Sequence, residues 1–401
     1  MSSKLKFLIP LTFLSLLLAF RFFQIYTKPK PVTGEEIRFL GKVLQEPVIL
    51  GQSQYFQVGH FRVRTKLLPK FHYGDYLQIT GTPAANLLIS FPKIEKLGEK
   101  KNLLSPILAF RRFLISTSNQ LWPQPEASLL TGIILGQDAI SADFRQALIN
   151  TGTIHIVVVS GQNVSMLAGV ITATFGRVAA RRTVSILLII SVIFYTVLTG
   201  AQPPTIRAAI MGILAFLARI SGRENLGFVA LGITVFIMLF AQPELLFNIS
   251  FQLSTAATFG ILFAQPLIAA IFKNLPNFVK DSQSVTISAW IFTAPLIAFY
   301  FAQFTPVTPL SNLLVLPTVP FLMIAGAISL GFSSISLFLA KILAFFSFIP
   351  AFYFTFVTQN LAKIPFVSLK LPQFNIFIIA GCYVFLFTLI LWLKKRFLAN
   401  N

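Results

Sequence analysis

Polar residues that could do chemistry interrupt one apolar segment of the chain. Residues 151–175 read TGTIHIVVVSGQNVSMLAGVITATF, which is long and apolar enough to cross a bilayer. Inside it lie His155 and the polar run Ser160, Gly161, Gln162 and Asn163. Lipid satisfies neither these groups nor an unwound backbone, so such a break is stable only inside protein or beside a watery cavity. Transporters build binding sites and pathways from interrupted helices, and we therefore expect this chain to move a substrate across a membrane.

Each polar residue of this segment also has a purely structural explanation. Ser and Gly kink helices, but the amides of Gln162 and Asn163 need several hydrogen-bond partners. This requirement favours a passage lining over a mere kink. His155 is equally consistent with a neutral imidazole bonded to a neighbouring helix and with a polar group at the mouth of a pathway.

Arg207 lies near the start of another apolar segment, shortly after Pro203 and Pro204. Proline is favoured in a first helical turn, so we expect a helix to begin there. The guanidinium either snorkels to the outer surface or faces inward, where its planar fork suits phosphate. Farther along, Gln252 shares a predicted helix face with Asn248, and such small polar residues serve equally well to link helices or to line a pathway.

No motif for a metal, a cofactor or catalysis accompanies these residues. The chain has one cysteine, Cys382, and three histidines, none with H-x-H or H-E-x-x-H spacing. The phosphate-binding loop G-x-x-x-x-G-K-[ST] is absent. The apolar segments contain no nucleophile beside a base. We therefore expect no metal, no cofactor, no ATP hydrolysis and no enzymatic activity.

The composition of the chain is that of a polytopic membrane protein. Of 401 residues, 55% are hydrophobic and 11% are charged, and the mean hydropathy is +0.79. The net charge is +20, and from Phe144 onward the acids are Glu224, Glu244 and Asp281. Cation-coupled carriers use buried carboxylates, whereas a basic chain suits an anionic passenger such as a nucleic acid. Alternatively, many of the Lys and Arg residues only set topology.

The pattern divides the chain into four parts. Residues 1–27 hold a first span, residues 5–25, which we interpret as an anchor because no A-x-A cleavage site follows its long apolar run. Residues 28–101 alternate polar and apolar positions and predict a small extracytoplasmic β-barrel of the OB type. Residues 102–150 predict an amphipathic interfacial helix at 103–121 and short helices at 126–135 and 142–149. Residues 151–401 form the membrane domain. The strands predicted for the barrel are residues 36–44, 55–58, 61–67, 75–80 and 87–94.

The predicted fold class is therefore a polytopic α-helical membrane protein with one broken helix and a small OB-like domain. With the anchor, the apolar segments give about ten spans. Basic loops, beginning with Lys4 and Lys6, fall on one side under this arrangement, which places both termini in the cytoplasm of a cell-membrane protein. Lys363 and Lys370 are exceptions. The spans that follow the anchor are residues 153–175, 183–200, 204–220, 226–241, 247–268, 284–303, 308–331, 338–358 and 374–393.

One strand of the predicted barrel carries a basic strip. Arg62, Arg64 and Lys66 alternate along it and share a face, while Phe61 and Val63 point to the interior. A solvated face is the ordinary explanation. The functional one is contact with phosphates, since OB folds bind single strands with basic grooves and aromatic platforms. The aromatic candidates for stacking are Tyr55, Phe56, Tyr73 and Tyr76.

Three motifs occur in order along the chain: the interrupted segment described above, then GAQPPTIRAAIMG at 200–212 with PELLFNISFQLSTAATFG at 243–260, and PLSNLLVLP at 309–317. Together with the preceding OB-like region, they resemble the competence domain of the ComEC-type family, the inner-membrane DNA-uptake channels of natural transformation. The resemblance covers roughly residues 30–335. It implies a pathway for one DNA strand lined by His155, Ser160, Gly161, Arg207, Gln252 and Asn312, and it favours the phosphate role of Arg207. Gln162 and Asn163 join this set as polar residues of the break.

The resemblance also implies partners. These are single-stranded DNA, the lipid bilayer, a cytoplasmic motor or helicase and DNA-receptor proteins; a homo-oligomer stays open. Two departures from the family matter: Asn163 stands where many members have a second histidine, and no metallo-β-lactamase-like domain precedes Asn401. We therefore expect a separate protein to degrade the other strand. The alternative function is a transporter of a small anionic solute or lipid-linked precursor, with a structural outer domain.

Overall fold

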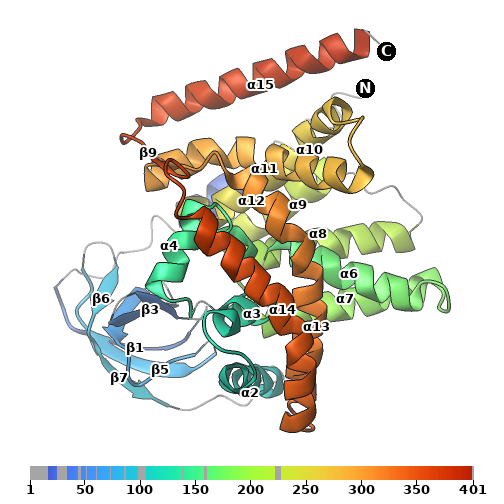
Figure 1. Ribbon diagram of the computed structural model, residues 1–401. Coiled ribbons are helices and arrows are strands. Elements are labelled where there is room, and N and C mark those ends of the chain that lie inside the picture. Colours follow the sequence, from blue (N-terminus) through green and yellow to red (C-terminus); the bar gives the residue numbers. More distant parts are fainter. Residues whose placement is uncertain are drawn as a thin grey trace.

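The computed structural model describes residues 17–24, 34–43, 47–50, 52–59, 61–72, 74–84, 87–97, 105–137, 139–157, 160–221 and 227–399. It consists of a small β domain packed beside a large set of helices, with the last helix, α15, lying at the edge of the helical part (Figure 1). Most of the predicted anchor lies outside the described residues, although residues 17–24 are helical.

The β domain has two sheets instead of a closed barrel. One sheet has the order β1-β5-β7 and the other β2-β3-β4-β6, with β4 and β6 parallel. Only two isolated bridges, Val43–Val58 and Pro83–Ile89, connect the sheets among the described residues. The OB-like barrel is thus not confirmed, although a small β region is. The strands are β1 (Ile37–Lys42), β2 (Val48–Leu50), β3 (Ser53–Val58), β4 (Phe61–Lys66), β5 (Tyr76–Gly81), β6 (Leu88–Ser90) and β7 (Lys93–Lys96).

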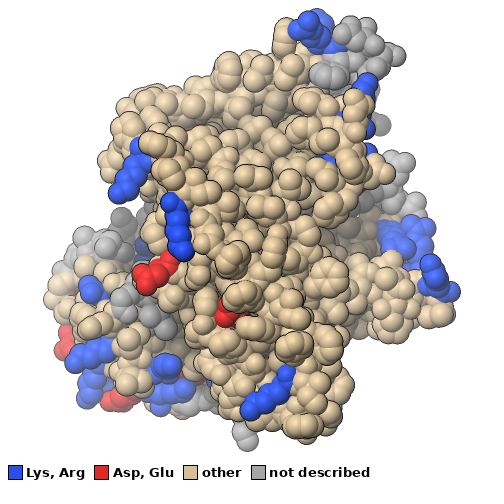
Figure 2. Space-filling model, in the orientation of Figure 1, with Lys and Arg blue, Asp and Glu red and all other residues tan. Residues whose placement is uncertain are grey.

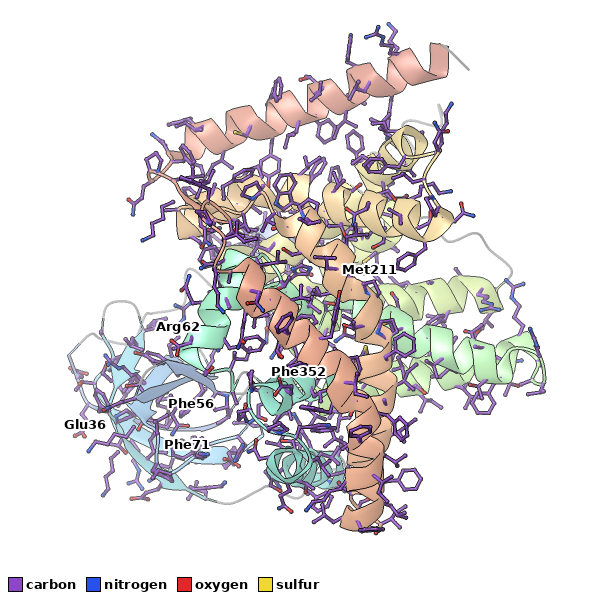
Figure 3. All side chains as sticks on the ribbon, viewed as in Figure 1. Glu36, Phe56, Arg62, Phe71, Met211 and Phe352 are labelled. Carbon is purple, nitrogen blue, oxygen red and sulfur yellow. The ribbon has the colours of Figure 1, made fainter. Side chains whose placement is uncertain are left out.

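The strand predicted at 87–94 is two strands in the structure. Phe91 has a φ of 51°, and Pro92 has no N–H to donate to a ladder, so the chain turns between β6 and β7. The core of the domain forms as the alternation predicts: Val63 is fully buried, and Phe56 and Phe71 lie between the sheets (Figure 3).

Seven helices of the described residues are long and apolar enough to cross a membrane. They match seven of the predicted spans, and they give a helical multi-pass membrane protein. These segments are α7 (Arg181–Leu198), α8 (Pro203–Ile220), α10 (Ile249–Ile271), α11 (Asn277–Phe301), the run Thr308–Phe332, α14 (Leu337–Leu361) and α15 (Ile376–Ala399). The run comprises α12 (Thr308–Val315), the 3-10 turn η2 (Leu316–Thr318) and α13 (Val319–Phe332).

The predicted count of about ten spans is not confirmed. In place of the span predicted at 153–175 there are two helices, α5 (Ile154–Val157) and α6 (Gly161–Phe175). Helix α9 (Gly227–Ala241) coincides with the segment predicted at 226–241 but is among the shorter apolar helices. Helices α6 and α9 have 15 residues each. At 1.5 Å per residue such a helix is roughly 22 Å long, shorter than a hydrocarbon core of about 30 Å.

A short helix, α3 (Glu126–Leu135), lies at the centre of the helical part. All ten of its residues are buried, and it packs against α2 (Ser105–Leu121), α13 and α14. Arg111 of α2 is also buried, and its Nη2 donates to the carbonyl of Leu135 at 3.1 Å. Helix α4 (Ala142–Asn150) follows, with Ser141 at its N-cap but no hydrogen bond from that side chain.

Charge separates the surface into zones. In Figure 2, Lys and Arg gather over the β domain and at the far ends of the helices, while the surface between them is mostly uncharged. This uncharged band is what a bilayer-facing surface requires.

Candidate functional site

The structure has two helices in the polar segment, with residues 158 and 159 between them lying outside the described residues. Helix α5 ends at Val157 and α6 begins at Gly161, with Ser160 extended at the N-cap (φ −121°, ψ 173°) and no side-chain cap bond. Gln162 and Asn163 therefore belong to the first turn of α6. The N-terminus of α6, with its partial positive charge, stands at the break.

Gly161 lies directly against Arg207 of α8. A Cβ added at Gly161 would lie 3.4 Å from Nη2 of Arg207 and 3.4 Å from Cβ of Ala208. The side chain of Arg207 is 7% exposed. Its Nε donates to Oγ of Ser254 at 2.7 Å, and its Nη1 lies 3.4 Å from Sδ of Met211. The first motif thus meets the second through this arginine.

The electrostatics at this point are unbalanced. No carboxylate forms an ion pair with Arg207 among the described residues, and a buried charge without a counter-charge is costly. The partial positive charge at the start of α6 adds to that of the guanidinium. A helix N-terminus beside an arginine favours an anionic group such as phosphate. We call Gly161, Arg207 and Ser254 the Arg207 site; its charge is of the sign that attracts anions.

Asn163 joins helices in this structure. It is 1% exposed, and its Nδ2 donates to the carbonyl of Ile133 in α3 at 3.0 Å. The hydroxyl of Tyr195 in α7 donates to the same carbonyl at 3.4 Å. The pair fixes α6 and α7 to the central helix and so holds the Arg207 site in place. Gln162, one residue earlier, is exposed.

His155 is exposed on α5, and its Nδ1 is bonded to the carbonyl of Gly152 at 2.8 Å. The bond lies within its own turn, so the imidazole does not link two helices. Gly152, with φ 72°, packs closely on Thr308 of α12. One turn after Thr308, Asn312 is 3% exposed, and its Oδ1 has no hydrogen-bond partner among the described residues. No hydrogen bond joins His155 or Asn312 to Arg207 among the described residues.

Gln252 also links segments. Its Nε2 donates to the carbonyl of Leu246 at 2.7 Å, and its Oε1 accepts from the hydroxyl of Tyr300 at 2.7 Å. These bonds tie α10 to α11 and to the turn η1 (Pro243–Phe247). Asn248 caps α10 by accepting from the N–H of Phe251. Ser254, which accepts the hydrogen bond from Arg207, lies in the same FQLS motif. Sequence reasoning did not name Ser254 as a site residue, although this motif could have indicated it.

The basic strip of β4 has an aromatic surround. Arg62 and Lys66 are exposed, whereas Arg64 is half-buried with its guanidinium carbon 5.6 Å from the ring of Tyr55 and 5.2 Å from that of Phe91. Phe91 is 52% exposed. Sequence reasoning missed Phe91, although a Phe-Pro pair at a strand end is a turn signal. Of the other aromatic candidates, Phe56 is in the core and Tyr73 lies outside the described residues.

Groups that could hold a metal ion are absent from the described residues. The helical part instead has a buried cation, Arg207, beside the N-terminus of α6. The β domain has the basic strip of β4 with its aromatic neighbours. Both arrangements suit an anionic ligand.

The comparisons with known proteins agree with the motifs. Over 261 residues the chain is 26% identical to ComE operon protein 3 of Bacillus subtilis (strain 168), covering 65% of this chain and 33% of that protein. It is 31% identical over 225 residues to an uncharacterized protein of Aquifex aeolicus (strain VF5), covering 55% of this chain and 49% of that protein. YcaI, an uncharacterized protein of Escherichia coli (strain K12), is 23% identical over 236 residues, or 55% of this chain and 31% of YcaI.

The matched regions thus span 31–49% of the length of these curated relatives. No solved structure matches it. A family model described as competence protein matches residues 133–396, which include the Arg207 site and every helix from α5 to α14. Since that match covers more than half of the 401 residues, this chain belongs to the competence protein family.

Proposed function

We propose that this protein takes part in DNA uptake and that its helices form a passage for single-stranded DNA into the cytoplasm. The family and the relative named ComE operon protein 3 support the role in uptake. The observation that carries the passage is the Arg207 site, where a buried guanidinium with no carboxylate partner among the described residues stands beside the N-terminus of α6. Phosphodiesters are the anions that a DNA strand presents to such a site.

The β domain acts as the receiver in this proposal. The Arg64 platform, which we define as Tyr55, Arg64 and Phe91, offers rings and a guanidinium on which bases stack, and Arg62 and Lys66 lie beside it for phosphates. The pairings β1–β3, β3–β4, β4–β6, β6–β5 and β5–β1 form a ring if the two isolated bridges are counted. That ring supports an OB-like architecture with two weakly bonded seams.

The topology of the proposal follows the positive-inside rule. The basic turn after α6 and the basic end of α15 would face the cytoplasm, and the β domain, on the other side of the uncharged band, would face outward (Figure 2). Energy would come from a partner, a cytoplasmic motor or helicase, because no nucleotide-binding loop occurs in the sequence. Chemistry on the DNA is assigned to other proteins.

The experiment is uptake of a labelled single-stranded oligonucleotide into proteoliposomes that contain the full chain. Arg207→Gln should abolish entry, while Arg219→Gln, at the other end of the same helix, should leave it near the wild-type rate. Entry should fall steeply with salt, because phosphate contacts release counterions. Equal entry through both variants would overturn the assignment of Arg207.

A small-anion transporter remains a second function because the Arg207 site holds one buried guanidinium and so suits one anionic group at a time. The same vesicles distinguish the two functions. A DNA passage should be insensitive to millimolar inorganic phosphate and should admit long strands. A small-anion carrier should move labelled phosphate and exclude the oligonucleotide.

A further inference from the structure

The segment that joins α14 to α15 folds back onto the end of α11 (Figure 1). Its short strand β9 (Leu369–Lys370) pairs antiparallel with β8 (Gln303–Phe304), which follows α11. The N–H of Leu371 donates to the carbonyl of Ala302 at 2.8 Å. Because α11, α14 and α15 are all long and apolar enough to cross a membrane, this segment lies at the level where spans end. That level is the interface between a bilayer and water.

A cavity of about 510 Å³ lies beside this pair of strands, within the range of ligand pockets, roughly 300–1,000 Å³. We call it the β8–β9 cavity. Three parts of the chain form its wall: the second half of α4, the end of α11 with β8, and the segment that carries β9. Apolar and polar groups alternate in this wall, which suits a ligand that is itself part apolar and part polar. The polar lining residues are Gln146, Asn150, Gln303, Ser368 and Lys370.

One side of the cavity is a turn that presents an aromatic ring outward. Phe366 is 81% exposed and has a φ of 62°. It is the third residue of the turn Ile364–Val367, in which the N–H of Val367 donates to the carbonyl of Ile364 at 3.4 Å. A type II turn has a positive φ at this place and favours glycine there, with proline before it, as Pro365 is here. A bulky residue in this conformation is uncommon and marks functional segments. At the end of a span, the bilayer interface is the surroundings that aromatic rings prefer.

The exposed apolar surface continues from the cavity onto the spans. Phe301 and Ile364 line the cavity and are exposed. Phe356, in the last turns of α14, and Phe377, in the first turn of α15, are exposed as well. Side chains of this kind on spanning helices lie against acyl chains. A lipid whose headgroup enters the cavity therefore has apolar surface on both sides for its chains.

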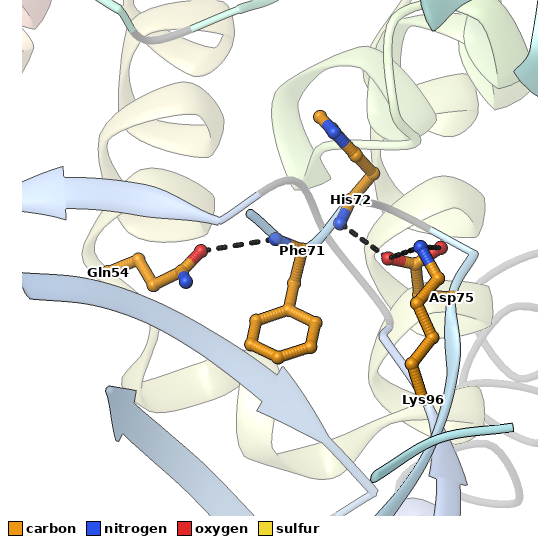
Figure 4. A network of polar contacts seen from close by, with 5 residues as sticks. All are labelled: Gln54, Phe71, His72, Asp75 and Lys96. Atoms are coloured by element: carbon orange, nitrogen blue, oxygen red, sulfur yellow. Dashed lines mark hydrogen bonds and ion pairs between the residues drawn. The ribbon is translucent and has the colours of Figure 1, made fainter. Parts of the chain in front are cut away.

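Lys370 gives the lining a positive charge. Lys96 of the β domain is neutralised by an ion pair of 2.9 Å with the fully buried Asp75 (Figure 4), whereas no ion pair involves Lys370 among the described residues. Topology does not account for Lys370 either, since it and Lys363 are the exceptions to the positive-inside pattern of this chain. A lysine at the bilayer interface attracts the phosphate of an anionic lipid.

We propose that the β8–β9 cavity binds the headgroup of an anionic phospholipid. Lys370 contacts the phosphate, and Phe366 inserts beside the upper part of the acyl chains. A membrane lipid fits better than a free anion, because the cavity lies at the ends of spans and its rim is apolar. Asn150 is the last residue of α4 and lines the cavity, so the bound lipid also supports the helix that leads to the break before α6. The site does not depend on the passage of DNA.

The test is native mass spectrometry of the full chain released from nanodiscs that contain equal amounts of phosphatidylglycerol and phosphatidylcholine. The wild type should retain phosphatidylglycerol in preference to phosphatidylcholine. Lys370→Gln should lower this preference about fivefold, which is the effect of one lysine beside an anionic lipid surface. Lys273→Gln is the matched control, because Lys273 is an exposed lysine in the turn between α10 and α11, at the other end of α11. It should leave the preference unchanged.

Phe366→Gly separates the ring from the charge. Glycine suits the positive φ of this turn, so the variant should fold. Its retention of both lipids should fall severalfold, while the preference for phosphatidylglycerol stays that of the wild type. Phe366→Trp should retain both lipids as the wild type does, because tryptophan also favours the interface.

Several results would overturn this site. One is a preference in Lys370→Gln equal to that in Lys273→Gln, and another is equal retention of the two lipids by the wild type. Full retention by Phe366→Gly would remove the ring from the site. Displacement of the retained lipid by millimolar inorganic phosphate would assign Lys370 to a free anion. Weaker binding of a labelled thymidine strand by Lys370→Gln and Phe366→Gly, with lipid retention unchanged, would make the segment a DNA site instead.

Discussion

The Cα of Gly161 faces the guanidinium of Arg207 so closely that an added Cβ would stand 3.4 Å from Nη2. A glycine at this position exposes the N-terminus of α6 to the arginine, and the two positive ends converge without a carboxylate among the described ion pairs. This contact joins two sequence motifs through residues that lie more than forty positions apart.

Substitution of Gly161 should separate function from stability. With Gly161→Ala we expect the free energy of unfolding to change by no more than about 1 kcal/mol, because 3.4 Å is a tight but tolerable contact. DNA entry should nevertheless fall, since the methyl group covers Nη2. Gly161→Leu should abolish entry and cost about 1–3 kcal/mol through overpacking. Thermal unfolding in detergent and oligonucleotide uptake measure the two effects; normal uptake by the leucine variant would contradict the role of this contact.

The two buried arginines should respond in opposite ways to the same substitution. Arg207→Met removes a buried charge that no carboxylate balances among the described residues. This gain should at least offset the lost hydrogen bond to Ser254, so the protein should be as stable or more stable, by up to about 4 kcal/mol, and unable to pass DNA. Arg111→Met removes a charged hydrogen bond to the end of α3, which should destabilise the fold by about 1.5–3 kcal/mol. Unfolding of both purified variants under one condition decides this. A marked loss of stability in Arg207→Met would make that arginine structural.

Most of the correct sequence predictions came from hydropathy and from the alternation of polar and apolar residues. The seven long helices lie within several residues of predicted spans because a bilayer demands a fixed length of apolar chain. The alternation in β4 predicted a buried Val63 and an outward Arg62, and both hold. The position of the break was predicted to within a few residues, because Ser, Gly, Gln and Asn are rare together in apolar segments.

What the sequence did not reveal depends on contacts between distant segments. The partner of Asn163 is a carbonyl of Ile133, and no local pattern identifies which carbonyl a buried amide will reach. Helix α3 is too short to span a bilayer, so its length did not indicate where it lies in the fold. In the structure every one of its residues is buried. The two-sheet form of the β domain likewise depends on the turn at Phe91 and Pro92.

Replacing Asn163 should lower the stability of the fold without directly impairing DNA uptake. Asn163→Leu keeps the volume but leaves the carbonyl of Ile133 with only the longer bond from Tyr195. We expect a loss of about 1–3 kcal/mol, the usual result of breaking a buried hydrogen bond. Uptake should fall only in proportion to the amount of folded protein, which size-exclusion chromatography of the same preparation measures. A folded variant that passes no DNA would instead place Asn163 in the passage.

The Arg64 platform offers a pair of substitutions that separate charge from stacking. Arg64→Ala should weaken binding of single-stranded DNA by the full chain and lower the salt slope by about 0.7, the share of one phosphate contact. Phe91→Ala should weaken binding by about 1–3 kcal/mol, the value of one stacked base, and leave the slope unchanged, because a neutral ring releases no counterions. Both side chains are outside the core cluster of the β domain, so the fold should tolerate both changes. Fluorescence anisotropy with a labelled thymidine strand at several salt concentrations provides both quantities. Identical slopes for the two variants would show that Arg64 meets bases and not phosphates, and unchanged affinity in both would remove the platform from the path of the DNA.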